Sequence, residues 1–130
     1  MRSFSKWVVL LAAAVLAACN NMAPIQNVGN VTVSAQANKP LTAEQVRAAI
    51  VRAGAGLGWI MKEVGPGKLN GILLLRTHTA EVDIGYSASE YSITYKSSTN
   101  LQQAGSQIHK NYNGWIQNLN RGINAQLAAT

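Results

Sequence analysis

Few side chains in this 130-residue sequence suit catalysis or covalent attachment, and Cys19 has the most informative surroundings. It is the only cysteine of the chain. Upstream of it lie a basic start with Arg2 and Lys6 and an unbroken apolar run over residues 7–18. This order is typical of the signal peptide of an exported precursor. A run of twelve residues is also shorter than the roughly twenty that a membrane-spanning helix needs.

The order Leu16-Ala17-Ala18-Cys19 resembles the lipobox of bacterial lipoproteins. The resemblance implies that residues 1–18 are cleaved, that the Cys19 thiol carries a diacylglycerol, and that the new amine is acylated. Two or three acyl chains would anchor the protein in a lipid bilayer, because each buried methylene contributes about 0.8 kcal/mol. The alternative is a secreted protein with a chance cysteine, whose free thiol would then need another explanation.

The residue after the cysteine, Asn20, bears on the compartment. In the lipoproteins that this start resembles, an aspartate at that position tends to keep the protein in the inner membrane. The resemblance therefore implies the periplasmic face of the cell outer membrane, with the inner membrane as the alternative.

The charge of the chain argues against a nucleic-acid partner. Eleven Lys and Arg residues against five Asp and Glu residues give a formal +6. Loss of Arg2 and Lys6 with the signal leaves nine against five, or +4. No two of these nine basic residues are adjacent, whereas nucleic-acid binding usually needs a clustered basic face.

The remaining candidate catalytic residues form no recognised motif. His78 and His109 lack the HxxxH spacing of a zinc site, and a hydrolase would need one of them to meet a carboxylate and a hydroxyl through folding alone. Glu81 and Asp83 share one strand face, as a general acid and base can, but Lys96 is expected opposite. This favours a solvated ion-pair face, with a ligand-binding face as the alternative. We predict no catalytic residue, metal or cofactor.

Several elements can be predicted around these residues. A first helix over residues 42–54 has Thr42 at its N-cap, and Gln45 three residues later completes a capping box. The glycines between residues 54 and 58 close this helix rather than open one, so they do not form a dinucleotide-binding loop.

Antiparallel strands are predicted between residues 59 and 97. The first two cover residues 59–64 and 69–75, and the apolar run 72–75 favours a central strand covered on both faces. A turn near residues 76–78 leads to a hairpin that reverses at 87–90. Its register pairs Tyr86 with Tyr91, Ile84 with Ile93, Val82 with Tyr95, Glu81 with Lys96 and Asp83 with Thr94.

A last helix is predicted over residues 106–127, because its apolar residues recur every three or four positions. Its other face is rich in amides rather than charges. We expect a partner to cover part of this face, at Asn113, Gln117 and Asn120, with a simply polar, solvated face as the alternative.

The expected fold class is α+β. It has two layers, with an antiparallel β-meander in the order α-β-β-β-β-α and both helices on one sheet face. Residues 19–40 lack a sustained period, so we expect the lipidated cysteine and a flexible tether there, with a short edge strand near 31–33 as the alternative. Residues 41–130 suffice for a single periplasmic domain.

The segments Tyr91-Ser92-Ile93-Thr94-Tyr95 and 108–116 resemble a family of small proteobacterial lipoproteins, within a similarity over residues 53–127. The resemblance implies an outer-membrane lipoprotein and carries over no catalytic residue. We expect a non-enzymatic interaction or accessory module, anchored in the lipid bilayer through acylated Cys19 and bound to an envelope protein complex. The alternative is a binder of glycan or lipid that uses aromatic rings such as Trp59 and Trp115, and the third possibility is an envelope hydrolase.

Overall fold

The computed structural model describes residues 21–130, so Cys19 and the predicted signal peptide lie outside the described residues. Within the described residues, seven strands and three helices follow one another. They are β1 (Met22–Pro24), β2 (Val28–Thr32), α2 (Val33–Ala37), α3 (Ala43–Gly56), β3 (Trp59–Gly65), β4 (Lys68–Leu75), β5 (His78–Tyr86), β6 (Glu90–Thr99), β7 (Gln107–His109) and α4 (Lys110–Ala128).

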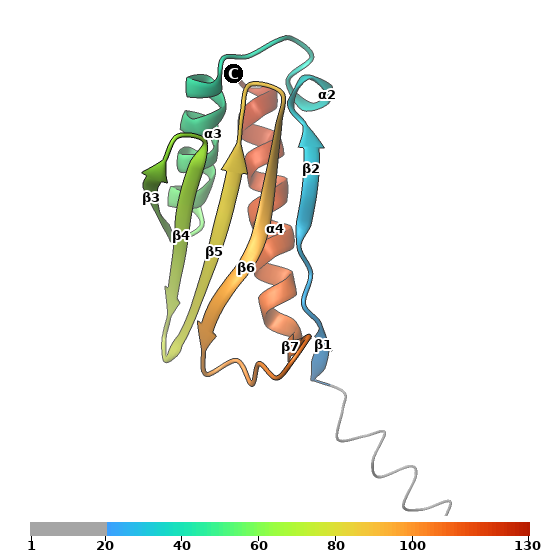
Figure 1. The fold of residues 1–130 in the computed structure, drawn as a ribbon, viewed down its shortest axis with the longest axis vertical. Coiled ribbons are helices and arrows are strands. Elements are labelled where there is room, and N and C mark those ends of the chain that lie inside the picture. Colours follow the sequence, from blue (N-terminus) through green and yellow to red (C-terminus); the bar gives the residue numbers. More distant parts are fainter. Residues whose placement is uncertain (1–20) are drawn as a thin grey trace, which may run out of the picture.

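Five strands form one antiparallel sheet in the order β2-β6-β5-β4-β3, and α3 and α4 lie behind it in the view of Figure 1. The short strands β1 and β7 pair with each other next to the start of α4. This arrangement confirms the α+β fold class, with a β3-β4-β5-β6 meander and helices on one face. Each helix has one apolar stripe and the sheet has one apolar face, so the two layers bury each other.

The core lies between the sheet and the two long helices. Its members are side chains that the strand and helix periods place on facing surfaces, and many of them are 1% exposed or less. They include Val46 and Ile50 of α3, Val82 and Ile84 of β5, and Ile116, Leu119 and Ile123 of α4. The apolar stripe predicted for the last helix is therefore confirmed.

The start of α3 forms as predicted. The Thr42 hydroxyl accepts a hydrogen bond from the backbone N–H of Gln45 (3.1 Å), and the backbone N–H of Thr42 donates to the Gln45 side chain (2.9 Å). Two N–H groups that the helix itself cannot satisfy are thus paired, which fixes where the helix begins.

The β5–β6 hairpin has the predicted register over most of its length. Tyr86, Ile84, Val82 and Asp83 lie opposite their predicted partners. The pairing of Glu81 with Lys96 is wrong, because a bulge between Glu81 and Val82 sets Glu81 opposite Ser97. A bulge adds one residue to one strand, and alternation alone does not reveal where it falls.

The predicted flexible tether over residues 19–40 is wrong for residues 22–37. β2 adds an edge strand to the sheet beside β6, which is the predicted alternative with a longer strand. Val33 of α2 is fully buried, and its backbone N–H donates to the carbonyl of Ser89 (2.9 Å). The folded unit therefore includes residues 22–37.

The start of the last helix also differs from the prediction. α4 begins at Lys110 rather than at residue 106, because β7 takes up Gln107–His109 to pair with β1. The ordered chain start and the later start of α4 are linked, because residues 22–24 pair with residues 107–109 just before α4.

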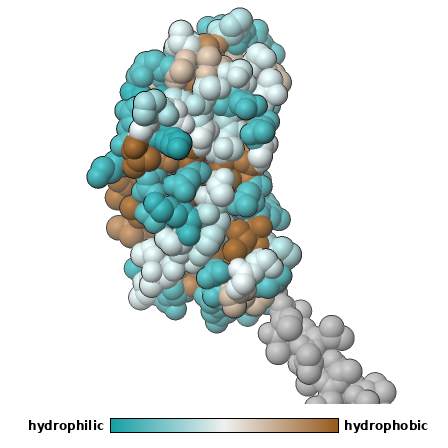
Figure 2. All heavy atoms as spheres, viewed as in Figure 1, coloured by the Kyte–Doolittle hydropathy of each residue, from teal (hydrophilic) through white to brown (hydrophobic). Residues whose placement is uncertain are grey.

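The sheet face away from the helices is uncovered by the described residues, so the prediction that residues 69–75 are covered on both faces is wrong. Leu73 faces the helices and is buried, whereas Leu74 is 60% exposed on the other face. Ile60 and Val64 of β3 are 59% and 57% exposed. Figure 2, which looks onto this face, shows hydrophobic surface gathered along its β3–β4 side.

No helix within residues 21–130 has both the length and the apolar character required to cross a membrane.

Candidate functional site

Three adjoining hollows share Trp115 as a lining residue. We call them the Trp115 groove. The first is a small apolar hollow of about 100 Å³, lined by Leu57, Trp59, Leu73, Leu75, Trp115 and Asn118. The second is a polar hollow of about 250 Å³, lined by His78, Asn100, Leu101, Gln102, His109, Asn111 and Trp115. The third is a wide amide-rich hollow of about 520 Å³, whose lining includes Gln26, Lys110, Asn113, Gln117 and Asn118.

The groove is built where several elements end or begin. Leu75 ends β4, His78 begins β5, and Leu57 follows the last turn of α3. Trp115 lies in the second turn of α4 and is half-buried. The ends of helices and strands leave such side chains partly exposed, because no further turn or strand packs over them.

Both histidines of the sequence lie in the groove. The ring of His78 lies 6.4 Å from the ring of Trp115, with the planes tilted by 53°. Nδ1 of His78 is 2.7 Å from the carbonyl oxygen of Asn100, so this nitrogen donates the hydrogen bond. Nδ1 of His109 accepts from the backbone N–H of Asn111 (3.2 Å) and caps α4. Folding thus brings together two residues that are 31 positions apart.

The hydrogen bonds of these histidines are structural rather than catalytic in kind. Each ring is oriented by a backbone group, whereas the serine and cysteine hydrolases use a carboxylate to orient the base. The acidic side chains lie elsewhere, on α3, β3, β5 and β6. Within residues 21–130, no three His, Cys, Asp or Glu side chains are grouped to hold a metal ion. The rings of both histidines are therefore held in place by backbone groups of the same chain.

Glu81, Asp83 and Lys96 do not join the groove. Glu81 accepts hydrogen bonds from the Ser97 hydroxyl (2.8 Å) and from the side-chain amide of Asn70 (3.3 Å). The bond from Ser97 is the main reason that the pKa of this carboxyl is below its ordinary value, and Asn70 and the charge of Lys96 lower it further. Glu81 is held as an anion on the uncovered sheet face, and Asp83 is exposed there opposite Thr94.

The amides predicted to meet a partner are mostly engaged within the chain. Asn113 is only 5% exposed; its side chain donates to the carbonyl of Pro24 (2.9 Å) and accepts from the backbone N–H of Gln26 (3.0 Å). Gln117 donates to the side chain of Gln26 (3.1 Å). The predicted cover on this helix face is therefore the N-terminal segment of the same chain.

Asn120 is engaged on a different contact. The Tyr91 hydroxyl lies 2.5 Å from Oδ1 of Asn120 and 2.6 Å from Oδ1 of Asn124. Burial raises the pKa of Tyr91 above its ordinary value, so this hydroxyl stays a hydrogen-bond donor. Of the three predicted partner-surface residues, only Gln117 is exposed.

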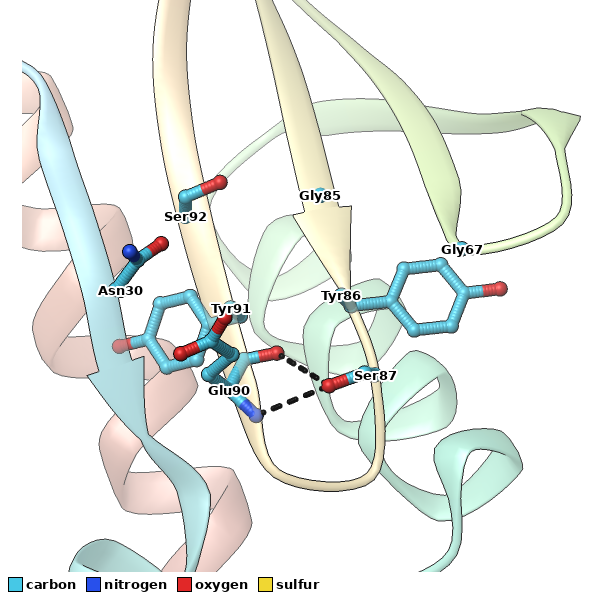
Figure 3. Close-up of a pocket in the computed structure, with 8 residues that line it drawn as sticks. All are labelled: Asn30, Gly67, Gly85, Tyr86, Ser87, Glu90, Tyr91 and Ser92. Atoms are coloured by element: carbon cyan, nitrogen blue, oxygen red, sulfur yellow. Dashed lines mark hydrogen bonds between the residues drawn. The ribbon is translucent and has the colours of Figure 1, made fainter.

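A further hollow lies at the opposite end of the sheet, at the β5–β6 turn (Figure 3). The Ser87 hydroxyl accepts there from the backbone N–H groups of Ser89 (3.1 Å) and Glu90 (3.2 Å). These bonds are those of a serine that stabilises a tight turn. In Figure 3 the ring of Tyr91 points toward α4 and that of Tyr86 points the other way, so neither faces the other across this hollow.

Sequence reasoning missed Leu57, Leu75, Asn100 and Asn111 as lining residues of the Trp115 groove. Leu57 carried one signal, since it is a large apolar residue between Gly56 and Gly58, where a solvated turn is expected. Asn100 has a positive φ of 61°, which places its carbonyl at the His78 ring. That geometry has no signature in the sequence beyond the tolerance of asparagine for this conformation.

Comparison of the chain with models of known families, with curated proteins and with solved structures finds no match. The resemblance to small proteobacterial lipoproteins stays a prediction.

Two buried tyrosines give a matched test of the α4 packing. The Tyr91 hydroxyl has one hydrogen to donate and lies within hydrogen-bond distance of two amide oxygens. The buried Tyr112 hydroxyl has no hydrogen-bond partner among the described residues, and the Tyr112 ring lies edge-on to that of Tyr95. We expect Tyr91→Phe to lower the free energy of unfolding by about 1 kcal/mol, because it removes the hydroxyl that donates to partly buried amide oxygens.

Tyr112→Phe is the control, and it should cost nothing or stabilise the fold, because it removes a buried hydroxyl with no partner. Urea unfolding of both variants provides the measurement. Equal losses in the two variants would show that the Tyr91–Asn120 contact is not formed.

Proposed function

We propose that this chain is a lipid-anchored protein of the bacterial cell envelope whose domain is a non-enzymatic binding module, and that the Trp115 groove holds its partner. The anchor rests on the Leu16-Ala17-Ala18-Cys19 pattern and on the basic and apolar residues before it. The outer membrane is the proposed location, because asparagine rather than aspartate follows Cys19.

One observation carries the proposal of a protein partner, which is the pairing of an apolar hollow with amide side chains. Leu57 and Leu75 are 42% and 43% exposed beside Trp115. A hydrophobic side chain of a partner can enter this hollow, while Asn118 in its lining and Gln117 in the neighbouring amide-rich hollow can hydrogen-bond to the partner's backbone. Binding surfaces of proteins commonly combine a buried aromatic or aliphatic anchor with a polar rim of this kind.

A second candidate function is the binding of an envelope glycan or lipid. Trp59 and Trp115 line the same hollow, and the neighbouring polar hollow offers His109, Asn111 and Gln102. An aromatic face beside several hydrogen-bonding side chains suits a sugar ring as well as a peptide. Lys96 belongs to β6 and does not line the groove, so it has no part in this alternative.

The anchor is tested by Cys19→Ser. Without the thiol no diacylglycerol can be attached, so the variant should stay uncleaved or leave the membrane fraction, while the unchanged protein is recovered with membranes. Fractionation of envelopes and the mass of the N-terminal peptide provide the measurement. An unaltered distribution after this change would refute lipidation at Cys19.

The groove is tested by photocrosslinking in cells from Asn118, with Lys39 at the exposed α2–α3 loop as the matched control position. We expect a specific adduct from position 118 and none from position 39. Trp115→Ala should remove it, since loss of a central aromatic anchor costs about 2 kcal/mol, or roughly 30-fold in affinity.

The outcome separates the two candidates. A protein adduct supports a protein partner. Loss of that adduct when purified envelope glycan or lipid is added supports the binding of a glycan or lipid. Identical adducts from both positions, or adducts that survive Trp115→Ala, would contradict a role for the groove.

A further inference from the structure

We infer that the anchored domain has no free tether and rests directly on the lipid bilayer, with the end that carries the β4–β5 turn, the β6–β7 loop and the start of α4 toward the headgroups. The inference rests on the proposed lipid anchor at Cys19. It deepens that proposal, because it fixes which end of the domain faces the membrane.

The first described residue is already attached to the body of the domain. The backbone N–H of Lys110 donates to the carbonyl of Asn21 (2.9 Å), and that of Ile25 donates to the carbonyl of Ser106 (2.8 Å). Between these bonds, β1 pairs with β7 over three residues. Asn113 then holds Pro24 and Gln26.

This attachment leaves almost no slack before the anchor. Cys19 precedes Asn21 by two residues, and a chain extends by at most about 3.6 Å per residue. A lipid-bearing Cys19 is therefore within about 7 Å of Asn21, whose carbonyl is bonded to the start of α4. A flexible spacer of about twenty residues, by contrast, would let the domain wander some 25 Å from the surface.

The charges of this end suit an anionic bilayer. The segments that meet there are residues 21–25, 75–78 and 99–110, and they contain Arg76 and Lys110 but no aspartate or glutamate. α4 also has no acidic residue in its first turn. Basic side chains close to a membrane are attracted by anionic headgroups.

The other end of the sheet is far from the anchor and carries both signs of charge, with Glu90 at the start of β6 and Lys68 at the start of β4. The nine residues of β5 separate the two ends by about 30 Å. Figure 1 shows β1, the β4–β5 turn and the β6–β7 loop together at the lower end, with the β5–β6 turn at the upper end. The Trp115 groove opens near the lower end, so its ligand is met close to the bilayer surface.

Depth-dependent quenching tests the orientation. The lipidated protein is reconstituted in vesicles of phosphatidylethanolamine and phosphatidylglycerol that carry a headgroup-attached nitroxide. A fluorophore is placed through Ser106→Cys at the lower end or through Ala88→Cys at the upper end, both at exposed positions. Acylated Cys19 has no free thiol to compete for the label.

We expect the label at position 106 to be quenched several-fold more than the label at position 88. Insertion of twelve Gly and Ser residues between Asn20 and Asn21 should keep the protein on the vesicles but bring the two values together. Equal quenching without the insertion, or an unchanged difference after it, would overturn the seated orientation while leaving the anchor intact. Failure of the unaltered protein to bind the vesicles would overturn the anchor and the orientation together.

Discussion

The side chain of Asn113 is the contact on which the arrangement of the chain start depends. It is buried in α4, and its amide binds the carbonyl of Pro24 and the N–H of Gln26 at the same time. A buried side-chain amide without hydrogen-bond partners would lower the free energy of unfolding. The carbonyl of Pro24 and the N–H of Gln26 would also lose their partners. This one residue thus ties a segment 89 positions earlier to the last helix. The β1–β7 pairing and the edge position of β2 extend the same attachment.

Local features of this fold can be predicted from the sequence, whereas contacts between distant segments cannot. The capping box at Thr42 and the Ile84–Ile93 pairing follow from residues close in sequence, which the period and the turn chemistry specify. The bulge at Glu81 and the pairing of β2 with β6 do not. β2 meets β6 across some sixty residues, and its amide-rich, glycine-containing sequence is also what a linker would have. Pairing between distant segments leaves no periodic trace in either one.

The amide-rich face of α4 is partly covered by another segment of the same chain. A helix face with few charges predicted a cover, and the cover is the chain's own N-terminal segment at Asn113 and Gln117. The surface left for a partner is consequently the Trp115 groove, whose two histidines and Trp59 were singled out from the sequence but not as neighbours. These residues come from β3, β5 and α4, so only the folded structure shows that they lie together at one end of the sheet.

Amide hydrogen exchange of the full-length protein tests most directly whether the chain start belongs to the folded domain. The amides of Ile25 and Gln26 are bonded to Ser106 and Asn113, so they should exchange slowly, as do hydrogen-bonded amides in the interior of a stable fold. Asn113→Ala should raise the exchange rate of these two amides selectively, with little change in the β5–β6 hairpin. Exchange of Ile25 and Gln26 at the rate of an unstructured peptide would contradict the account, because the domain would then hang on a free tether.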